Sequence, residues 1–354
     1  MKRTQDMPLM SSPFADLNWQ PPASWLRIAS IEMHTGGHPL RVITSGLPPI
    51  EGRNVLEKRR YFAEHYDYIR TGLMWEPRGH ADMYGAVVTP SEDADFDVFF
   101  LHNEGYSTMC GHAMIALSTL AVEGRVIRKP HEKQQFKINV PAGCVQAEAI
   151  VERGAVKEAT FRNVPSFLYL RDQEVVVPRL GRVRFDIAYG GAFYAIVDAL
   201  PLGLALIPEQ LNRLIDCGRQ IKDAVMAQFP IEHPFEQDLS FLYGTIFTGP
   251  AAQAGHHSRN VCVFADGEVD RSPTGSGVSA RAALHYAKGE LALNERITIE
   301  SIVGSTMTVH AAETTKFGRY DAIVPEVSGS AHITGRNEFY FDPNDPFRRG
   351  FLLR

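Results

Sequence analysis

The sequence predicts an α/β protein of two similar domains, in each of which a rolled sheet of short strands encloses a central helix. A polar, glycine-containing turn occurs twice, each time after an apolar strand and before a helix. The same 11 positions separate Phe99 from Cys110 and Val263 from Thr274. The helix after each turn is rich in small apolar residues, as a helix enclosed by its fold must be. We therefore expect two copies of one unit that face each other across a cleft.

Length and charge narrow the class of protein. The chain has 354 residues and a formal net charge of −5, which suits two domains with cores of their own and gives no reason to expect a nucleic-acid partner. The four cysteines, at 110, 144, 217 and 262, form no C-x-x-C pair. A disulfide framework or a structural zinc site is therefore not expected.

The N-terminus predicts a flexible lead-in over residues 1–25. It is polar, carries four prolines before residue 23 and lacks the apolar segment of a signal peptide. No run approaches the roughly 18 apolar residues that a membrane helix needs. We expect a cytoplasmic protein with no membrane partner.

The first domain is predicted to begin with a strand over residues 26–33, where apolar and polar residues alternate. A turn at Gly36-Gly37 follows, and then an amphipathic helix over residues 55–73. Strands at 83–90 and 96–101 lead to the turn at Cys110 and to an apolar helix over residues 113–121. Four short strands come next, at 136–140, 145–151, 159–164 and 174–177.

The second domain repeats this order from about residue 181. A strand at 183–189 runs into Gly190-Gly191, and an amphipathic helix follows over 211–229. Strands at 243–247 and 260–264 lead to the turn at Thr274 and a small-residue helix over 278–287. Final strands are expected at 305–311, 320–327 and 331–341, the last leading back to the first domain. The predicted domains are thus 26–180 with about 330–354, and 181–329.

Cys110 is the strongest candidate for chemistry. A cysteine at the start of a helix lies among unpaired backbone N–H groups at the positive end of the helix dipole. Both favour the thiolate, so we expect its pKa to fall below about 8.5, where the sulfur acts as a base or nucleophile. Gly111 leaves room for a ligand near the backbone, and His112 adds a polar group. The other three cysteines, Cys144, Cys217 and Cys262, are expected to be buried and inert.

The second turn, Thr274-Gly275-Ser276-Gly277, offers backbone donors for an anion such as a substrate carboxylate. Threonine before glycine is also an ordinary helix cap, so this run alone is a weak signal. Asp270 binds a substrate ammonium or caps the turn, and the sequence does not decide between the two. The segment 78–85 lines the cleft or is purely structural. No histidine pattern has metal-ligand spacing, so no metal is expected.

Several motifs together resemble the proline racemase family. They are Met33-His34-Thr35-Gly36-Gly37, Arg78-Gly79-His80, Asn103-Glu104-Gly105-Tyr106, Met109-Cys110-Gly111-His112 and Asp270-Arg271-Ser272-Pro273-Thr274-Gly275-Ser276-Gly277. The resemblance runs from about residue 28 to the C-terminus. It implies the diaminopimelate-epimerase-like fold, with the active site between two pseudo-symmetric domains, each a β-barrel-like sheet around a helix. It also implies a small imino-acid substrate and no cofactor, and a homodimer is left open.

The resemblance also implies roles for residues. Family racemases place a cysteine on each face of the substrate α-carbon, whereas here Thr274 stands in place of the second. A threonine hydroxyl is too weak an acid and base to exchange an α-proton, so this Cys/Thr pair is similar to that of the trans-3-hydroxy-L-proline dehydratases. Their expected product is Δ1-pyrroline-2-carboxylate. A proline racemase or hydroxyproline epimerase is one alternative, and a non-catalytic imino-acid-binding protein is another.

By the same resemblance, Cys110 is the base that removes the α-proton, and Thr274 contacts the 3-hydroxyl directly or through water. Gly111, His112, Gly275 and Ser276 bind the carboxylate, and Asp270 with His112 holds the ring nitrogen. His38 stands where many family members have glutamate, so no role is assigned to it.

Overall fold

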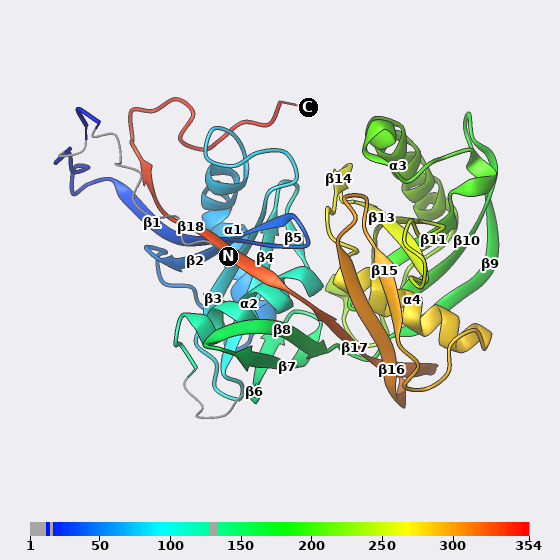
Figure 1. Cartoon of the computed structure of the whole chain (residues 1–354). Coiled ribbons are helices and arrows are strands. Elements are labelled where there is room, and N and C mark those ends of the chain that lie inside the picture. The colour runs from blue at the N-terminus through cyan, green and yellow to red at the C-terminus, as the bar shows by residue number, and fades with distance from the viewer. Residues whose placement is uncertain (1–11, 15–16, 128–132, 354) are drawn as a thin grey trace.

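The computed structural model describes residues 12–14, 17–127 and 133–353. Of the predicted lead-in, residues 1–11, 15 and 16 lie outside the described part. The expected strand at the start of the first domain forms as β1 (Leu26–Thr35). Along the described chain, α-helices and short 3-10 turns lie between strands, and the strands are hydrogen-bonded into one continuous sheet (Figure 1).

The predicted helices form within a few residues of their expected limits. The amphipathic pair are α1 (Val55–Met74) and α3 (Leu211–Gln228). The apolar pair are α2 (Gly111–Glu123) and α4 (Gly275–Lys288). Helix α1 begins where the Asn54 side chain accepts a hydrogen bond from the Glu57 N–H at 2.9 Å, as expected of an asparagine N-cap.

The strands fall into two series with matching order. The first series is β1 with β2 (His38–Ser45), β3 (Tyr84–Thr89), β4 (Phe96–His102), β5 (Tyr106–Ser107), β6 (Lys133–Val140), β7 (Gly143–Glu152), β8 (Ala155–Arg162) and β18 (Ala331–Phe341). The second is β9 (Phe167–Val177), β10 (Gly181–Tyr189), β11 (Phe193–Asp198), β12 (Leu242–Gly249), β13 (Ser258–Phe264), β14 (Glu268–Val269), β15 (Ile297–Glu300), β16 (Thr306–Phe317) and β17 (Tyr320–Gly329).

Strand pairing repeats in the two series. In the first, β1 pairs antiparallel with β2, β2 parallel with β3, β3 antiparallel with β4, and β4 parallel with β6. In the second, β10, β11, β12, β13 and β15 pair in the same senses and the same order. The predicted duplication is therefore present in the pairing as well as in the element order.

Two strands cross between the series. Strand β9 pairs antiparallel with β10, although it directly follows β8 of the first series. Strand β18 pairs antiparallel with β1 over its whole length, although it follows β17. Strands β8 and β17 pair with each other at the junction. Strand β9 thus joins the second series by pairing although it precedes residue 181, and the domain limits stay a prediction.

Each half encloses one helix and carries another outside. Helix α2 packs against β1, β7, β8 and β18, and α4 packs against β9, β10, β16 and β17. Helix α1 packs on β4, and α3 packs on β12 and β13 (Figure 1). The enclosed pair is buried over most of its length, as their apolar sequences predict. This arrangement brings the first turns of α2 and α4 together at the centre of the molecule.

The first Gly-Gly turn places a site residue. Gly36 has φ +58° and Gly37 has φ +87°, and Thr35 pairs with His38 across this two-residue hairpin loop. Positive φ at both loop positions is typical of a type I′ turn, which glycine adopts without steric cost. Strand β2 therefore starts at His38, a strand that the sequence analysis did not predict.

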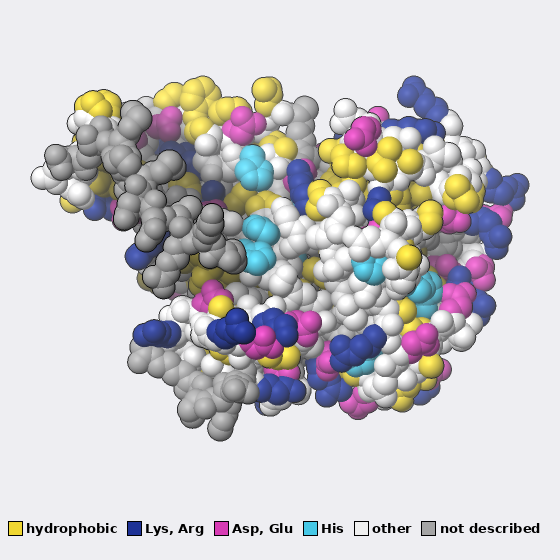
Figure 2. Space-filling view, in the orientation of Figure 1, with side chains coloured by type: hydrophobic (Ala, Val, Ile, Leu, Met, Phe, Trp, Pro, Cys, Tyr) yellow, Lys and Arg dark blue, Asp and Glu magenta, His cyan; other side chains and the backbone are white. Residues whose placement is uncertain are grey.

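The surface carries charges of both signs. On the face shown in Figure 2, basic and acidic side chains are interspersed, which agrees with the small net charge of the chain. Among the described residues, no helix has the length and apolar character needed to cross a bilayer.

Candidate active site

The two enclosed helices meet end to end at a pair of glycines. Cys110 is the N-cap of α2 and Thr274 is the N-cap of α4. A Cβ atom on Gly111 would lie 2.3 Å from the Gly275 Cα, and one on Gly275 would lie 2.5 Å from the Gly111 Cα. Only glycine permits this approach. The positive ends of two helix dipoles, with their unpaired N–H groups, therefore converge on one point, where they can bind a carboxylate.

A small pocket at this junction is lined by all seven site residues expected from the sequence: Cys110, Gly111, His112, Asp270, Thr274, Gly275 and Ser276. Six further residues line it: His38, Tyr84, Met109, Tyr194, Tyr243 and Phe264. The cavity holds about 20 Å³, which is room for about one water molecule. A five-membered ring therefore requires the two halves to separate before it can enter.

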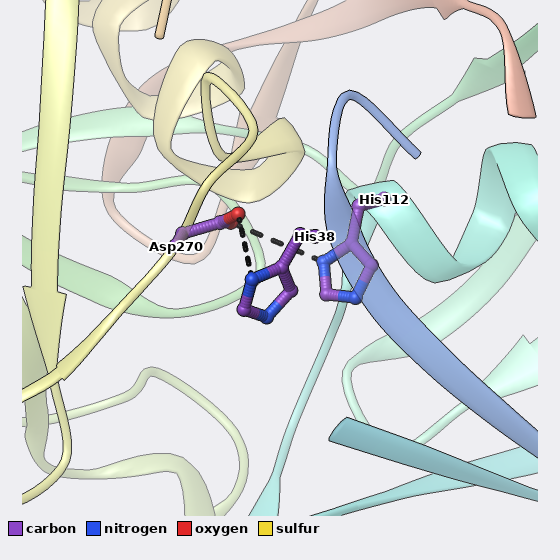
Figure 3. Close-up of side chains that lie close together, drawn as sticks. All are labelled: His38, His112 and Asp270. Carbon is purple, nitrogen blue, oxygen red and sulfur yellow. Dashed lines mark ion pairs between the residues drawn. The ribbon is translucent and has the colours of Figure 1, made fainter. Parts of the chain in front are cut away.

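Asp270 lies beside two buried histidines, whose rings contact each other with centroids 4.5 Å apart (Figure 3). Its Oδ1 is 3.5 Å from His38 Nδ1, and its Oδ2 is 3.9 Å from His112 Nδ1. Burial lowers the pKa of both imidazoles to about 3, so both rings are neutral near pH 7. The Arg271 backbone N–H donates to His38 Nδ1 at 3.2 Å, which assigns the His38 proton to Nε2. One carboxylate beside two neutral rings favours a cationic ligand.

These three side chains also have donor atoms suited to a metal. Their ligand atoms all lie within 4.8 Å of one another. The same space suits the ammonium group of an amino acid, because ammonium and metal ions both seek anionic oxygen ligands. The orientation of the Asp270 carboxylate is fixed by a hydrogen bond, which its Oδ1 accepts from the Ser272 N–H at 2.7 Å.

The acidity of Cys110 differs from the prediction. Its Sγ is 3.1 Å from His112 Nδ1. Burial raises the pKa of the thiol well above its usual value, and the Asp270 charge raises it further. Hydrogen bonds from the Ala113 N–H and the Tyr84 hydroxyl lower it, but by less. The expected lowering is therefore wrong, because desolvation of the buried thiol outweighs the helix terminus.

Thr274 is held in an unusual backbone conformation. Its φ is +69° and its ψ is +94°, a region that β-branched residues avoid and that costs on the order of 1–3 kcal/mol. Cys110, the equivalent residue in the first half, has an extended backbone with φ −141°. The Thr274 Oγ1 is buried and makes no well-formed hydrogen bond to the described residues. The next polar side chain, Ser276, is held by Tyr194, with Oη and Oγ 2.7 Å apart.

Sequence reasoning missed the residues that complete the pocket walls. His38 directly follows the recognised His34-Thr35-Gly36-Gly37 motif, and this position was the available signal. Tyr84 belongs to the segment 78–85, whose role was left open. Within that segment Arg78 donates to the Tyr340 carbonyl at 3.0 Å, a structural contact, whereas Tyr84 lines the pocket.

Contacts between the halves close the cleft. Asp82 pairs with Arg271 at 2.5 Å and accepts from the Val269 N–H at 3.3 Å. Glu268 lies 3.2 Å from His102 Nδ1 and accepts from the Glu104 N–H at 3.1 Å. These contacts hold β14 and the turn before Thr274 against the first half, directly beside the pocket.

Comparison with known proteins shows the family to which the chain belongs. The family model described as proline racemase matches residues 30–352. A trans-3-hydroxy-L-proline dehydratase of Colwellia psychrerythraea is 53% identical over 95% of this chain and 96% of that protein. A human protein of the same name is 48% identical, with 92% and 95% covered.

Solved structures give the same result at the level of the fold. A hydroxyproline epimerase from Agrobacterium vitis, with bound trans-4-hydroxy-L-proline, has a TM-score of 0.88 and 28% identity, covering 93% of this chain and 96% of that one. A probable proline racemase from Agrobacterium radiobacter, with bound carbonate, has a TM-score of 0.87 and 28% identity, with 92% and 96% covered. The predicted α/β fold of the diaminopimelate-epimerase type is confirmed by these likenesses.

Fold and site together define an enzyme of the class that works on a small substrate between two pseudo-symmetric halves. The chain belongs to the proline racemase family. Within that family, the relatives that it matches at 53% and 48% identity are dehydratases by name.

Proposed function

We propose that this protein is a trans-3-hydroxy-L-proline dehydratase, a hydro-lyase that needs no cofactor and forms Δ1-pyrroline-2-carboxylate. The observation that carries the proposal is the asymmetry of the two helix N-caps. Cys110 offers a thiol and Thr274, at the equivalent position, offers only a hydroxyl. The names of the relatives at 53% and 48% identity support the same activity.

The substrate is held by its two charged groups. Its carboxylate accepts hydrogen bonds from the N–H groups at the starts of α2 and α4, where Gly111 and Gly275 leave the backbone open. Its ring ammonium lies beside Asp270 and close to the neutral rings of His38 and His112. Negative charge moves towards the carboxylate as the α-proton leaves, so donors fixed at that end stabilise the transition state more than the ground state.

Cys110 removes the α-proton. Burial raises the pKa of the thiol most, and the charge of Asp270 raises it further. A bound ammonium beside Asp270 offsets that charge. Substrate binding therefore shifts Cys110 towards the thiolate, the form that acts as a base. Thr274 cannot serve as a second base, because a hydroxyl loses its proton far less readily than a thiol.

The stereochemistry of the substrate matches a single base. In trans-3-hydroxy-L-proline the hydroxyl is opposite the carboxylate and shares a ring face with the α-hydrogen. Loss of both is a syn elimination from the face towards Cys110. Breaking the Cα–H and C3–O bonds gives water and an enamine, which tautomerises to the cyclic imine.

A product assay tests the proposal. Purified protein and trans-3-hydroxy-L-proline are expected to give the pyrroline carboxylate, and Cys110→Ser is expected to lower the rate at least about 100-fold, since general base catalysis contributes 10²–10⁴-fold. Cys144→Ser is the matched control. The expectation that Cys144 is buried was wrong: it is exposed and lies outside the pocket, so the rate of this variant should equal the wild-type rate. Binding of the substrate without any product would instead favour the imino-acid-binding protein.

A further inference from the structure

The departing hydroxyl must be protonated from the wall that carries Cys110. Syn elimination places the 3-hydroxyl and the α-hydrogen on one ring face, and Cys110 takes the proton from that face. Thr274 belongs to the opposite half and caps the opposing helix. Side chains of the first half, beside Cys110, are therefore the ones that can protonate the 3-hydroxyl during the reaction. Thr274 is then left without the contact to the 3-hydroxyl that the family resemblance implied.

Tyr84 has the position that this step requires. It starts β3 and its side chain is buried in the pocket wall. Its ring lies edge-on to His112, with centroids 4.9 Å apart, and its hydroxyl pairs with the Ser107 Oγ. Tyr84 and Cys110 both line the pocket, so the phenol and the thiol belong to the same wall.

The protonation state of Tyr84 also fits this role. Burial raises the pKa of its phenol well above 10, so Tyr84 carries a proton at neutral pH that it can give to a departing hydroxide. His38 lies on the same side, but a neutral imidazole is a much weaker acid than a phenol.

We propose that Tyr84 is the general acid that protonates the departing 3-hydroxyl; this inference rests on the dehydratase function proposed above. The Cα–H proton passes to the Cys110 thiolate as the C3–O bond breaks. The Tyr84 proton passes to the leaving oxygen, which departs as water. The Tyr84 phenolate then regains a proton from the Cys110 thiol. Both side chains return to their starting forms, and one proton and one hydroxide have left the substrate as water.

The test compares two leaving groups in wild type and Tyr84→Phe. Hydroxide needs a proton to leave, whereas fluoride leaves as a stable anion. For trans-3-hydroxy-L-proline we expect kcat to fall at least about 100-fold in Tyr84→Phe, the usual size of a general-acid effect, with KM changed less than about threefold. For trans-3-fluoro-L-proline, fluoride release by the variant should stay within about fivefold of wild type, since that step does not use the acid.

Tyr189→Phe is the matched control. Tyr189 is a buried tyrosine outside the pocket, and its hydroxyl makes no hydrogen bond to the described residues. Removing that hydroxyl should leave both reactions at wild-type rates and shows that loss of a buried phenol oxygen is harmless in itself.

Three results would overturn the inference. Unchanged dehydration by Tyr84→Phe would show that the phenol takes no part. Equal losses of dehydration and fluoride release would show that Tyr84 serves the Cys110 thiolate instead of the leaving group. Absence of dehydration by the wild type would overturn the proposed function itself, and with it the role of Tyr84.

Discussion

At the scale of single residues, the protein is defined by what stands at two equivalent positions. Cys110 and Thr274 cap the two enclosed helices and line one pocket. They differ in side-chain acidity and in backbone, with φ −141° at one and +69° at the other. A strained threonine kept at a helix start is typical of functional sites, where the surrounding structure must hold it in place.

Replacing Thr274 tests whether the threonine itself takes part. Thr274→Cys puts a thiol on the second face of the α-carbon, so we expect slower dehydration and the appearance of α-proton exchange on L-proline. The two rates can be followed by pyrroline formation and by deuterium uptake. Thr274→Ser keeps the hydroxyl and is the control. Unchanged dehydration in Thr274→Cys would show that the threonine marks the subgroup without contributing to the reaction.

The protonation state of Cys110 can be measured directly. Burial raises its pKa, so the thiol is protonated at neutral pH and the thiolate fraction rises about tenfold per pH unit. The ultraviolet absorbance of the Cys110 thiolate, taken as the difference between wild type and Cys110→Ser, should still be rising above pH 8.5, where a small thiol in solution levels off. A plateau between pH 6 and 8 would show instead that the helix terminus dominates.

At the scale of elements, the site depends on two helices that approach through Gly111 and Gly275. At either position, any other residue would place a Cβ atom against the backbone of the facing helix. The repeated spacing of strand, turn and helix predicted that both turns face the cleft. It did not predict this contact, because the distance between two helix ends is set by the strands of both halves.

Gly275→Ala tests the contact. Its Cβ would lie 2.5 Å from the Gly111 Cα, so one helix end must shift, with an expected loss of 1–3 kcal/mol in stability, as is usual for overpacking. Because both ends hold the carboxylate, activity should fall at least about 100-fold, as a small misplacement of substrate can do. Gly335→Ala, where a Cβ meets no atom within 4 Å, is the control. Near-normal activity in Gly275→Ala would contradict the predicted carboxylate site.

At the scale of the whole molecule, closure of the two halves creates the environment of the site. Closure buries His38, His112 and Cys110 and leaves about 20 Å³ between them. The raised pKa of Cys110 is a consequence of this burial, which is why a local pattern of helix and turn predicted its direction wrongly. The pairing of β9 and β18 across the two halves is likewise a tertiary feature. The alternation of apolar and polar residues predicts a strand but does not show which strand it pairs with.

Closure also makes stability depend on pH. His38 and His112 have their pKa lowered to about 3 in the folded protein, against about 6.5 when unfolded. The unfolded chain therefore binds more protons below pH 6.5, and stability is lost as the pH falls from 6.5 towards 3. At pH 5 each buried ring should cost about 2 kcal/mol relative to pH 7.

Urea unfolding at pH 7 and pH 5 measures this loss. His38→Gln should show a smaller difference between the two pH values than wild type, because one of the buried rings is gone. His65→Gln, at an exposed histidine, should keep the wild-type difference. An identical pH dependence in wild type and His38→Gln would show that His38 is not buried and neutral in solution.

Much of the architecture was predictable, since both helix pairs and most strands follow local periodicity. The seven site residues expected from the motifs all line one pocket, because both motifs lie at the equivalent turn, directly before the enclosed helix of each half. The sequence analysis did not predict the rest of the pocket wall, which includes His38, Tyr84, Tyr194 and Tyr243. These residues lie in strands whose sequences are typical of a core, and only the packing of the two halves places them beside one pocket.

The central claim is that one thiol makes this site an eliminating enzyme and not a racemase. NMR of the purified protein in heavy water, with trans-3-hydroxy-L-proline in one sample and L-proline in another, tests it most directly. The account predicts pyrroline carboxylate from the first and no deuterated D-proline from the second. Deuterated D-proline forming as fast as the pyrroline product would contradict it.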